Sequence, residues 1–173
     1  MNNYKLLHLV NFHSIQNIIR KRINTIELPS SDGVFPHVDG IDVHMWMQSI
    51  SPLVLNLHEV GLYNYWVASS LVLTYKEIPV HKDNAHEFHY SLILPVINTE
   101  DTYTCFYECI QEPETSYLPN GLPYDSYHNS SCALVDRVEI TTPTLLNIKT
   151  PHGVTLGSNL TPRVTIALRL NNV

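Results

Sequence analysis

Two tripeptides of the chain have the form His-x-Asp, which places an imidazole and a carboxylate two residues apart. One covers residues 37–39 and the other residues 81–83. An imidazole and a carboxylate so close in the chain could offer two ligands to one metal ion. The chain has ten histidines, so one match by chance is unremarkable. His37 lies in a stretch rich in Pro and Gly and is interpreted as a surface turn, whereas His81 ends an apolar strand that can hold a metal site rigidly.

A facial triad needs a third ligand from elsewhere in the sheet. We predict His152, which lies in a Thr-Pro-His-Gly segment between two predicted strands. With His81 and Asp83 it would make a two-histidine, one-carboxylate set that suits Fe(II) and leaves three coordination positions open. A histidine taken alone is more often structural than a ligand, so the assignment depends on what accompanies it.

An arginine, Arg163, lies eleven residues after His152. Arg163 begins the segment Arg-Val-Thr-Ile-Ala-Leu-Arg-Leu, in which period-two alternation places Arg163, Thr165 and Ala167 on one face of a strand. An arginine inside a barrel costs free energy unless it meets an anion, and its planar fork binds a carboxylate through two hydrogen bonds. The Thr165 hydroxyl can add another bond. The pattern therefore predicts a buried dicarboxylate.

The order of His-x-Asp, a distal His and Arg-x-Thr resembles the iron(II)/2-oxoglutarate-dependent oxygenase superfamily. The sequence around these motifs is similar to that of small oxygenase-like proteins of phage and marine microbial genomes. The similar segments are His-Tyr-Ser-Leu-Ile-Leu-Pro, Tyr-Thr-Cys-Phe-Tyr-Glu and Pro-His-Gly-Val. The resemblance covers about residues 65–170. It implies that the two histidines and Asp83 bind Fe(II), and that Arg163, assisted by Thr165, binds the distal carboxylate of 2-oxoglutarate.

The implied activity is that of a dioxygenase, in which O₂ and 2-oxoglutarate are consumed by oxidative decarboxylation and a C–H bond of an unknown substrate is oxidised. The resemblance also implies a role for Tyr75 at the same carboxylate, although the turn between Tyr75 and His81 is shorter than in prolyl-hydroxylase-like members. His86 and His89 follow the motif closely, and surface or packing roles are favoured over contact with the metal ligands or the substrate. Metal binding is expected to weaken as the pH falls through about 6.5, where a free histidine takes up a proton.

Two other classes of function remain open. A cupin-like metal protein of different activity would bind iron, manganese or zinc and give Arg163 no role. A non-enzymatic structural or binding module would keep the fold without the chemistry. Replacing Arg163 with Ala would distinguish the first of these from the oxygenase.

Strands must position these residues. Short segments rich in aromatic and β-branched residues, with turn signals between them, predict a sandwich or barrel, and the resemblance implies a mainly β, double-stranded β-helix of jelly-roll or cupin-like type. We expect one domain of 173 residues, in which residues 1–64 are helical or irregular support and residues 65–171 are the β-helix core. The predicted strands cover residues 65–75, 78–81, 89–97, 102–110, 132–140, 144–149 and 163–170.

Helices are predicted in the supporting part. Apolar residues at helical spacing indicate one over residues 13–22. Ser51 as N-cap, Pro52 at the first helical position and Gly61 just past the end predict another. Residues 111–131 contain three prolines and read as a long ordered loop that selects the substrate together with the supporting part. Its tyrosines are interpreted as packing the loop onto the sheet; they are Tyr117, Tyr124 and Tyr127.

Composition narrows the partners and the location. The net charge of −6 argues against a nucleic-acid partner. No stretch approaches the roughly 20 apolar residues of a membrane span, so no membrane partner is expected. Three cysteines do not suggest a disulfide framework and favour a reducing, cytoplasmic location. The substrate would be a small molecule or a protein side chain, and the oligomeric state is open.

Overall fold

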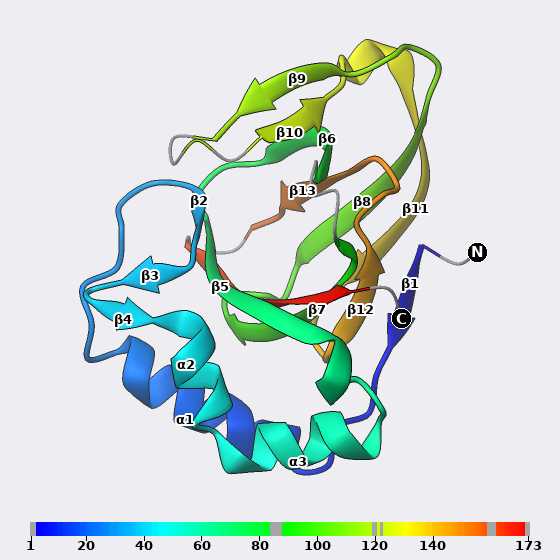
Figure 1. The fold of residues 1–173 in the computed structure, drawn as a ribbon. Helices are drawn as coiled ribbons and strands as arrows, with labels where there is room; N and C mark the ends of the chain where they lie inside the picture. The colour runs from blue at the N-terminus through cyan, green and yellow to red at the C-terminus, as the bar shows by residue number, and fades with distance from the viewer. Residues whose placement is uncertain (1–2, 84–87, 119–120, 122, 159–161, 172–173) are drawn as a thin grey trace.

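Two antiparallel six-stranded sheets face each other in the computed structural model, which describes residues 3–83, 88–118, 121, 123–158 and 162–171 (Figure 1). The prediction of a mainly β chain is therefore confirmed. The first sheet has the order β1-β12-β7-β14-β5-β2. Its strands are β1 (Tyr4–Leu6), β2 (Gly33–Phe35), β5 (Trp66–Thr74), β7 (Phe88–Ile97), β12 (Thr144–Asn147) and β14 (Arg163–Asn171).

The second sheet has the order β11-β8-β13-β6-β10-β9. After β5 the chain crosses between the sheets repeatedly, so that neighbouring segments of sequence supply both sheets. The strands of the second sheet are β6 (Ile78–Asp83), β8 (Thr102–Cys109), β9 (Glu114–Tyr117), β10 (Pro123–Ser126), β11 (Cys132–Glu139) and β13 (His152–Leu156).

Helices cover the outer face of the first sheet, at the lower left of Figure 1. They are α1 (Phe12–Ile23), α2 (Val43–Gln48) and α3 (Ser51–Glu59), and the short hairpin of β3 (His37–Val38) and β4 (Ile41–Asp42) precedes α2. Single 3₁₀ turns lie at Tyr63–Tyr65 (η1) and Asn129–Ser131 (η2). None of the helices in the described ranges is long and apolar enough to cross a membrane.

The central strand β14 separates two apolar cores. Its even-numbered residues, such as Ile166 and Leu168, are buried against the helices. Ala167 points the other way and belongs to the core between the sheets, which is built around Phe106 and Ile93. Because side chains alternate along a strand, the residues in phase with Ala167 also face the second sheet. The residues of β14 in this phase are Arg163, Thr165, Ala167 and Arg169.

The strands predicted at residues 65–75 through 163–170 form close to their predicted bounds, but two segments differ. His152 begins β13 instead of lying between strands. Within residues 111–131, predicted as a loop, β9 and β10 form a hairpin that pairs with the outer edge of β6. Both strands are short and mostly polar, so their sequence carries no hydrophobic alternation, and only the open edge of β6 makes them strands.

The helices also form where the sequence predicts them, with ends that are shifted by one residue. The predicted helix at residues 13–22 is α1, one residue longer at each end. In α3, Ile50 takes the N-cap position and Ser51 the first helical position, one place earlier than predicted. Gly61 follows the end of the helix with φ of 74°, which suits the role predicted for it.

The expectation that the cysteines form no disulfide is wrong. Cys109 and Cys132 are joined, with their Cα atoms 4.1 Å apart. The two residues are the last opposed pair of β8 and β11. This register was not visible in the sequence, where 23 positions separate them. The bond closes the segment that carries β9 and β10, while Cys105 is free and buried. The cysteine count therefore gives no support for a reducing compartment.

Candidate metal centre

The three predicted ligands meet between β6 and β13. His81 and Asp83 lie two residues apart on β6, so they share a face, and His152 is directly opposite His81 in the register of the two strands. The imidazole rings of His81 and His152 are 4.5 Å apart at their centroids. Each of the three side chains offers a ligand atom, and these atoms all lie within 4.8 Å of one another. Small side-chain rotations would let them share one ion.

Each histidine is oriented by a backbone carbonyl. The Nδ1 atom of His81 lies 2.9 Å from the carbonyl oxygen of Pro79, and the Nδ1 atom of His152 lies 2.9 Å from that of Thr150. A carbonyl can only accept, so Nδ1 is the donor in both rings, and in the neutral form of each ring Nε2 keeps its lone pair. Metal-binding histidines usually have a second ring nitrogen held in this way. The arrangement therefore presents two Nε2 atoms, together with the Asp83 carboxylate, to one point.

Gly153 allows β13 to come close enough to β6. A Cβ atom at this position would lie 2.7 Å from the carbonyl oxygen of Ile78, closer than real contacts allow. The pairing of β13 with β6 is irregular at this point, between His152 and Val154. Any larger residue would push the strands apart and would carry His152 away from His81.

Arg169 also reaches the site, and the sequence reasoning missed it. Its Nη1 atom donates to Oδ2 of Asp83, and the two side chains are 17% and 19% exposed. The other carboxylate oxygen, Oδ1, lies 3.5 Å from Nε2 of His81. Arg169 thus holds one oxygen of Asp83 and leaves the other toward the histidines. The alternation that placed Arg163 on the inner face of the strand could have been continued to find it.

The charges in the site shift the pKa values of all three ligands. Burial raises the pKa of Asp83, but the Arg169 charge and the hydrogen bond with His81 outweigh burial and hold it well below its usual value. Burial lowers the pKa of His81, but Asp83 outweighs this and raises it overall. Burial and the neighbouring His81 lower the pKa of His152 to about 4. His152 therefore stays neutral in mild acid, and His81 is the histidine that protonates first.

Arg163 lies in the interior, and none of the described residues gives it a counter-charge. It is 4% exposed, and its Nε atom is buried without a hydrogen-bond partner. Burial lowers its pKa to about 10. In the part of the chain that the structure describes, no carboxylate lies within ion-pair distance of it. Arg163 is opposite Thr74, at the end of β5 that leads into β6. Thr165 is buried on the same face.

The structure does not bring Tyr75 to the site. Its hydroxyl donates to the carbonyl oxygen of Pro29 at 2.8 Å, and its ring packs into the core beside the helices. Alternation along β5 turns Thr74 inward and Tyr75 outward, which the short turn before His81 did not reveal. His89 is exposed, in agreement with its interpretation as a surface residue, and His86 lies outside the described residues. His37 is exposed, as predicted, but it begins the short strand β3 instead of lying in a turn.

The β9–β10 hairpin forms one wall beside the ligands. Ser126 is opposite His81 and Tyr124 is opposite Asp83. The Tyr124 ring meets the His81 ring edge-on, with centroids 5.9 Å apart. Lys82 points the other way, with its Nζ atom 5.4 Å from the centroid of Tyr127. Tyr124 and Tyr127 therefore pack as predicted, whereas Tyr117 is exposed.

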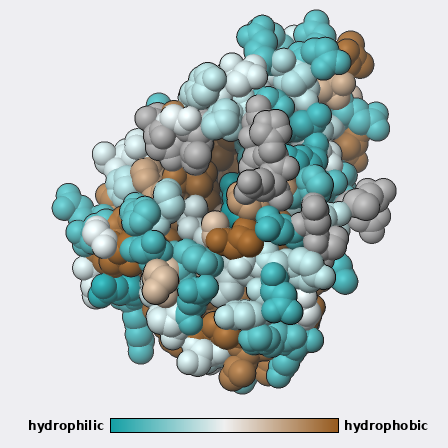
Figure 2. Space-filling view, in the orientation of Figure 1, coloured by the Kyte–Doolittle hydropathy of each residue, from teal (hydrophilic) through white to brown (hydrophobic). Residues whose placement is uncertain are grey.

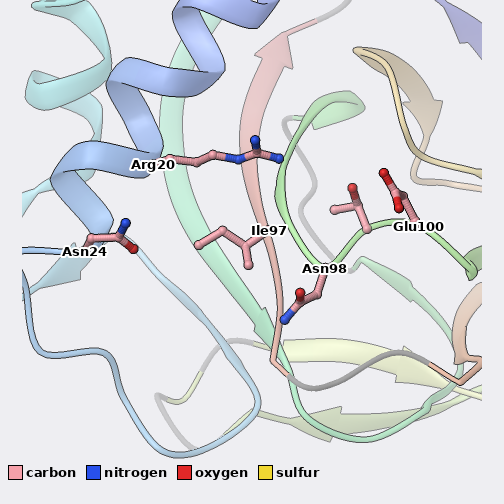
Figure 3. Close-up of a pocket in the computed structure, with 6 residues that line it drawn as sticks. Arg20, Asn24, Ile97, Asn98 and Glu100 are labelled. Carbon is pink, nitrogen blue, oxygen red and sulfur yellow. The ribbon is translucent and has the colours of Figure 1, made fainter.

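The surface is hollowed over the region where β6 and β13 lie (Figure 2). A different cavity, of about 440 Å³, lies between α1 and the turn that follows β7 (Figure 3). It is lined by polar residues that include Arg20 and Glu100, and none of the three ligands lines it. Arg20 donates from Nε to the carbonyl oxygen of Val96 at 2.6 Å, which gives this side chain a structural role. The candidate metal centre therefore lies elsewhere, in the interior between the sheets.

Comparisons with known proteins leave the family open. Neither the protein-family models nor the curated proteins contain a match. Among solved structures, the chain is similar to AviO1 from Streptomyces viridochromogenes Tue57 (14% identity, TM-score 0.49, covering 99% of this chain and 90% of that one). It is also similar to a Pseudomonas putida prolyl-4-hydroxylase (12% identity, TM-score 0.46, covering 100% and 94%). A Cellulomonas parahominis L-ribose isomerase matches at 16% identity with a TM-score of 0.35, covering 83% and 59%. Similarities this distant carry no argument about activity, so function must be argued from the site.

Proposed function

We propose that this protein is an Fe(II)- and 2-oxoglutarate-dependent oxygenase. One observation carries the proposal: β6 and β13 bring together a His-Asp-His cluster, and Arg163, in phase with the inward-facing Ala167, is buried with no partner for its Nε among the described residues. The cluster fits a metal ion, because two oriented Nε2 atoms and a carboxylate oxygen converge. The arginine fits an anion, which the described residues do not supply. A molecule that binds a metal at one end and carries a carboxylate at the other satisfies both.

The proposed fold is a double-stranded β-helix built from β5 to β14. In its favour, β5, β7, β12 and β14 belong to the first sheet, while β6, β8, β11 and β13 belong to the second. Successive strands thus alternate between the sheets except from β8 to β11, as expected where a paired ribbon is wound into two facing layers. Both metal-binding strands, β6 and β13, are neighbours in the second sheet.

Each side chain has a defined task. His81, Asp83 and His152 would hold Fe(II) on one face and leave the opposite face to the co-substrate and O₂. Arg169 keeps Asp83 ionised and leaves only one of its oxygens for the metal. Arg163, with Thr165 on the same face, would bind the distal carboxylate of 2-oxoglutarate and so orient the molecule. Phe106, opposite His152 and fully buried, keeps the floor of the site apolar.

Fe(II) and 2-oxoglutarate, when bound, would supply the chemistry: O₂ is the oxidant, 2-oxoglutarate is converted to succinate and CO₂, and the second oxygen atom oxidises a C–H bond of the substrate. The protein supplies position and charge. Water is excluded on the sheet side by the core around Phe106, and the substrate would enter beside the β9–β10 hairpin, which stands next to His81.

Anaerobic addition of Fe(II) and 2-oxoglutarate to metal-free protein tests the proposal through the visible metal-to-ligand charge-transfer absorption. The wild-type protein should develop the band. His81→Ala should abolish it, and Arg163→Ala should require far more 2-oxoglutarate. Arg137→Ala is the matched control, because this exposed arginine lies over the Tyr103 ring on the outside of the second sheet. A folded wild-type protein without a band at saturating concentrations would exclude the oxygenase and leave a metal protein of another kind or a structural module.

A further inference from the structure

We propose that the hydroxyl of Thr74 forms part of the carboxylate-binding subsite and donates a hydrogen bond to the anion that Arg163 binds. The inference rests on the proposed function, because the anion in question is the distal carboxylate of 2-oxoglutarate. Thr74 is the last residue of β5. It belongs neither to the sequence motif of His-x-Asp, distal His and Arg-x-Thr nor to the candidate metal ligands.

Thr74 faces the interior beside Arg163. The two residues are directly opposite each other in the pairing of β5 with β14, so their side chains leave the sheet on the same side. Along β5, Val72 packs into the core between the sheets, whereas Leu71 and Leu73 pack against the helices. Thr74 is in phase with Val72 and therefore points to the interior.

The Thr74 hydroxyl is buried and has no partner. The residue is 0% exposed, and Oγ1 makes no hydrogen bond. In the described part of the chain, this atom and Nε of Arg163 are the buried side-chain nitrogen or oxygen atoms that lack a partner. It is unusual for folded proteins to leave such groups unsatisfied, and each one calls for an explanation. That both come from one register pair points to a single missing acceptor.

Other buried threonines show what an ordinary structural role looks like here. Thr102 and Thr144 are equally buried, and each donates its hydroxyl to a nearby backbone carbonyl at 2.8 Å, on Thr99 and Thr142 respectively. The Thr74 hydroxyl donates to no backbone carbonyl. A carboxylate offers about four lone-pair sites, so it can accept from the guanidinium and from a hydroxyl together. The hydroxyl at this position would thus be satisfied only when the anion is bound.

The test replaces Thr74 with Val, which keeps the shape and removes the hydroxyl, and with Ser, which keeps the hydroxyl. Binding of 2-oxoglutarate and of 2-oxovalerate, which lacks the distal carboxylate, is measured by calorimetry on the Mn(II)-loaded proteins. Thermal unfolding of each metal-free protein is measured in parallel. Thr102→Val is the matched control for loss of a buried hydroxyl, and Arg163→Ala reports on the subsite as a whole.

Thr74→Val should weaken 2-oxoglutarate binding by roughly tenfold or more, as for a hydrogen bond to a charged group, and should leave 2-oxovalerate binding unchanged. Thr74→Ser should bind nearly as the wild type does. Without ligand, Thr74→Val should melt no lower than wild type, because it removes an unsatisfied buried group, whereas Thr102→Val should melt lower.

The possible failures are distinct. If Arg163→Ala weakens 2-oxoglutarate binding and Thr74→Val does not, the inference about Thr74 is overturned and the proposed function stands. If wild type binds 2-oxoglutarate no better than 2-oxovalerate, the carboxylate subsite does not exist and both are overturned. A lower melting temperature for metal-free Thr74→Val would show that the hydroxyl has a structural partner, which also contradicts the inference.

Discussion

The charges at the candidate centre depend on a few side chains. Asp83 has three cationic or potentially cationic neighbours, namely Arg169, His81 and His152. Only Arg169 carries a permanent charge, so it keeps the carboxylate ionised when no metal is present. A divalent ion would add charge to the same carboxylate. Arg169 therefore has two effects that can be separated, on the stability of the metal-free protein and on the geometry of Asp83.

Arg169→Met should destabilise the metal-free protein by roughly 3 kcal/mol, because it leaves a mostly buried carboxylate without its partner. Addition of Mn(II) should restore more stability to the variant than to the wild type, because the ion replaces the missing charge. Urea unfolding with and without Mn(II) measures both effects. Arg137→Met, on the exposed outer face, should change stability by less than about 1 kcal/mol. Equal stability of the two variants would contradict the role assigned to Arg169.

The stability of the metal-free protein should fall in acid because of His152. Its pKa is about 4 in the folded protein and about 6.5 in the unfolded chain. Between these values the unfolded chain binds a proton that the folded chain does not, so the free energy of unfolding falls as the pH drops, by about 3 kcal/mol for this group. His81 acts in the opposite sense: its raised pKa stabilises the folded protein below about 6.5, and this contribution is lost as the pH rises through the raised value.

Urea unfolding at pH 7 and pH 4 measures this effect. His152→Gln should lose less stability between the two pH values than wild type does. The same loss in both proteins would mean that other groups cause the acid sensitivity. Because His152 resists protonation, metal binding in mild acid is expected to depend on His81 and not on both histidines equally, which refines the midpoint of about 6.5 expected for a free imidazole.

At the scale of elements, the close approach of β13 to β6 determines whether the ligands meet. Gly153→Ala would place a methyl group against the Ile78 carbonyl. It should cost about 1–3 kcal/mol of stability and should weaken Mn(II) binding by moving His152. Gly61→Ala is the control. An alanine with φ of 74° would have a strained backbone, but its methyl group would meet no atom within 4 Å. That variant should lose about 1–2 kcal/mol with Mn(II) affinity unchanged. Unchanged affinity in Gly153→Ala would show that the glycine does not position the site.

The Cys109–Cys132 bond connects the ends of the segment that carries the β9–β10 hairpin. Loop-closure entropy for about 24 residues predicts a loss of about 3 kcal/mol when both cysteines are replaced by serine. Denaturant unfolding measures the loss, and limited proteolysis should cut the double variant between β8 and β11 before any other region. Cys105→Ser, in which a free buried thiol is changed, is the control for handling and for loss of sulfur. If the protease leaves the β9–β10 hairpin of the double variant uncut, pairing with β6 is sufficient to keep the hairpin ordered without the disulfide.

Sequence reasoning located the parts of the site that follow from strand alternation and failed where the partner is distant. The apolar strand that ends at His81 is visible in the sequence, and it distinguishes residues 81–83 from the other His-x-Asp tripeptide. His152 was found by type and order, but its strand was not, because β13 is short and contains a glycine. The disulfide and the β9–β10 hairpin depend on which strands become neighbours, and nothing local encodes that. Tyr75, expected at the carboxylate from the resemblance, packs beside the helices, on the other side of the first sheet.

At the scale of the whole molecule, the first sheet is shared between two cores. Its outer face buries apolar side chains against α1, α2 and α3, while its inner face carries the polar residues of β14 toward the second sheet. The apolar packing on the outer side stabilises a strand whose inner face carries two arginines. This division lets one strand hold Arg163 near the β5–β6 turn and Arg169 beside Asp83, so that charges lie at both ends of the proposed cavity.

The most direct test of this account is diffraction from crystals grown without oxygen in Fe(II) and 2-oxoglutarate, with anomalous data collected at the iron edge. We expect one iron peak, bonded to Nε2 of His81, Nε2 of His152 and Oδ1 of Asp83. The distal carboxylate of 2-oxoglutarate should lie against the guanidinium of Arg163. An iron peak elsewhere, or a 2-oxoglutarate molecule that leaves Arg163 unpaired, would contradict the central claim.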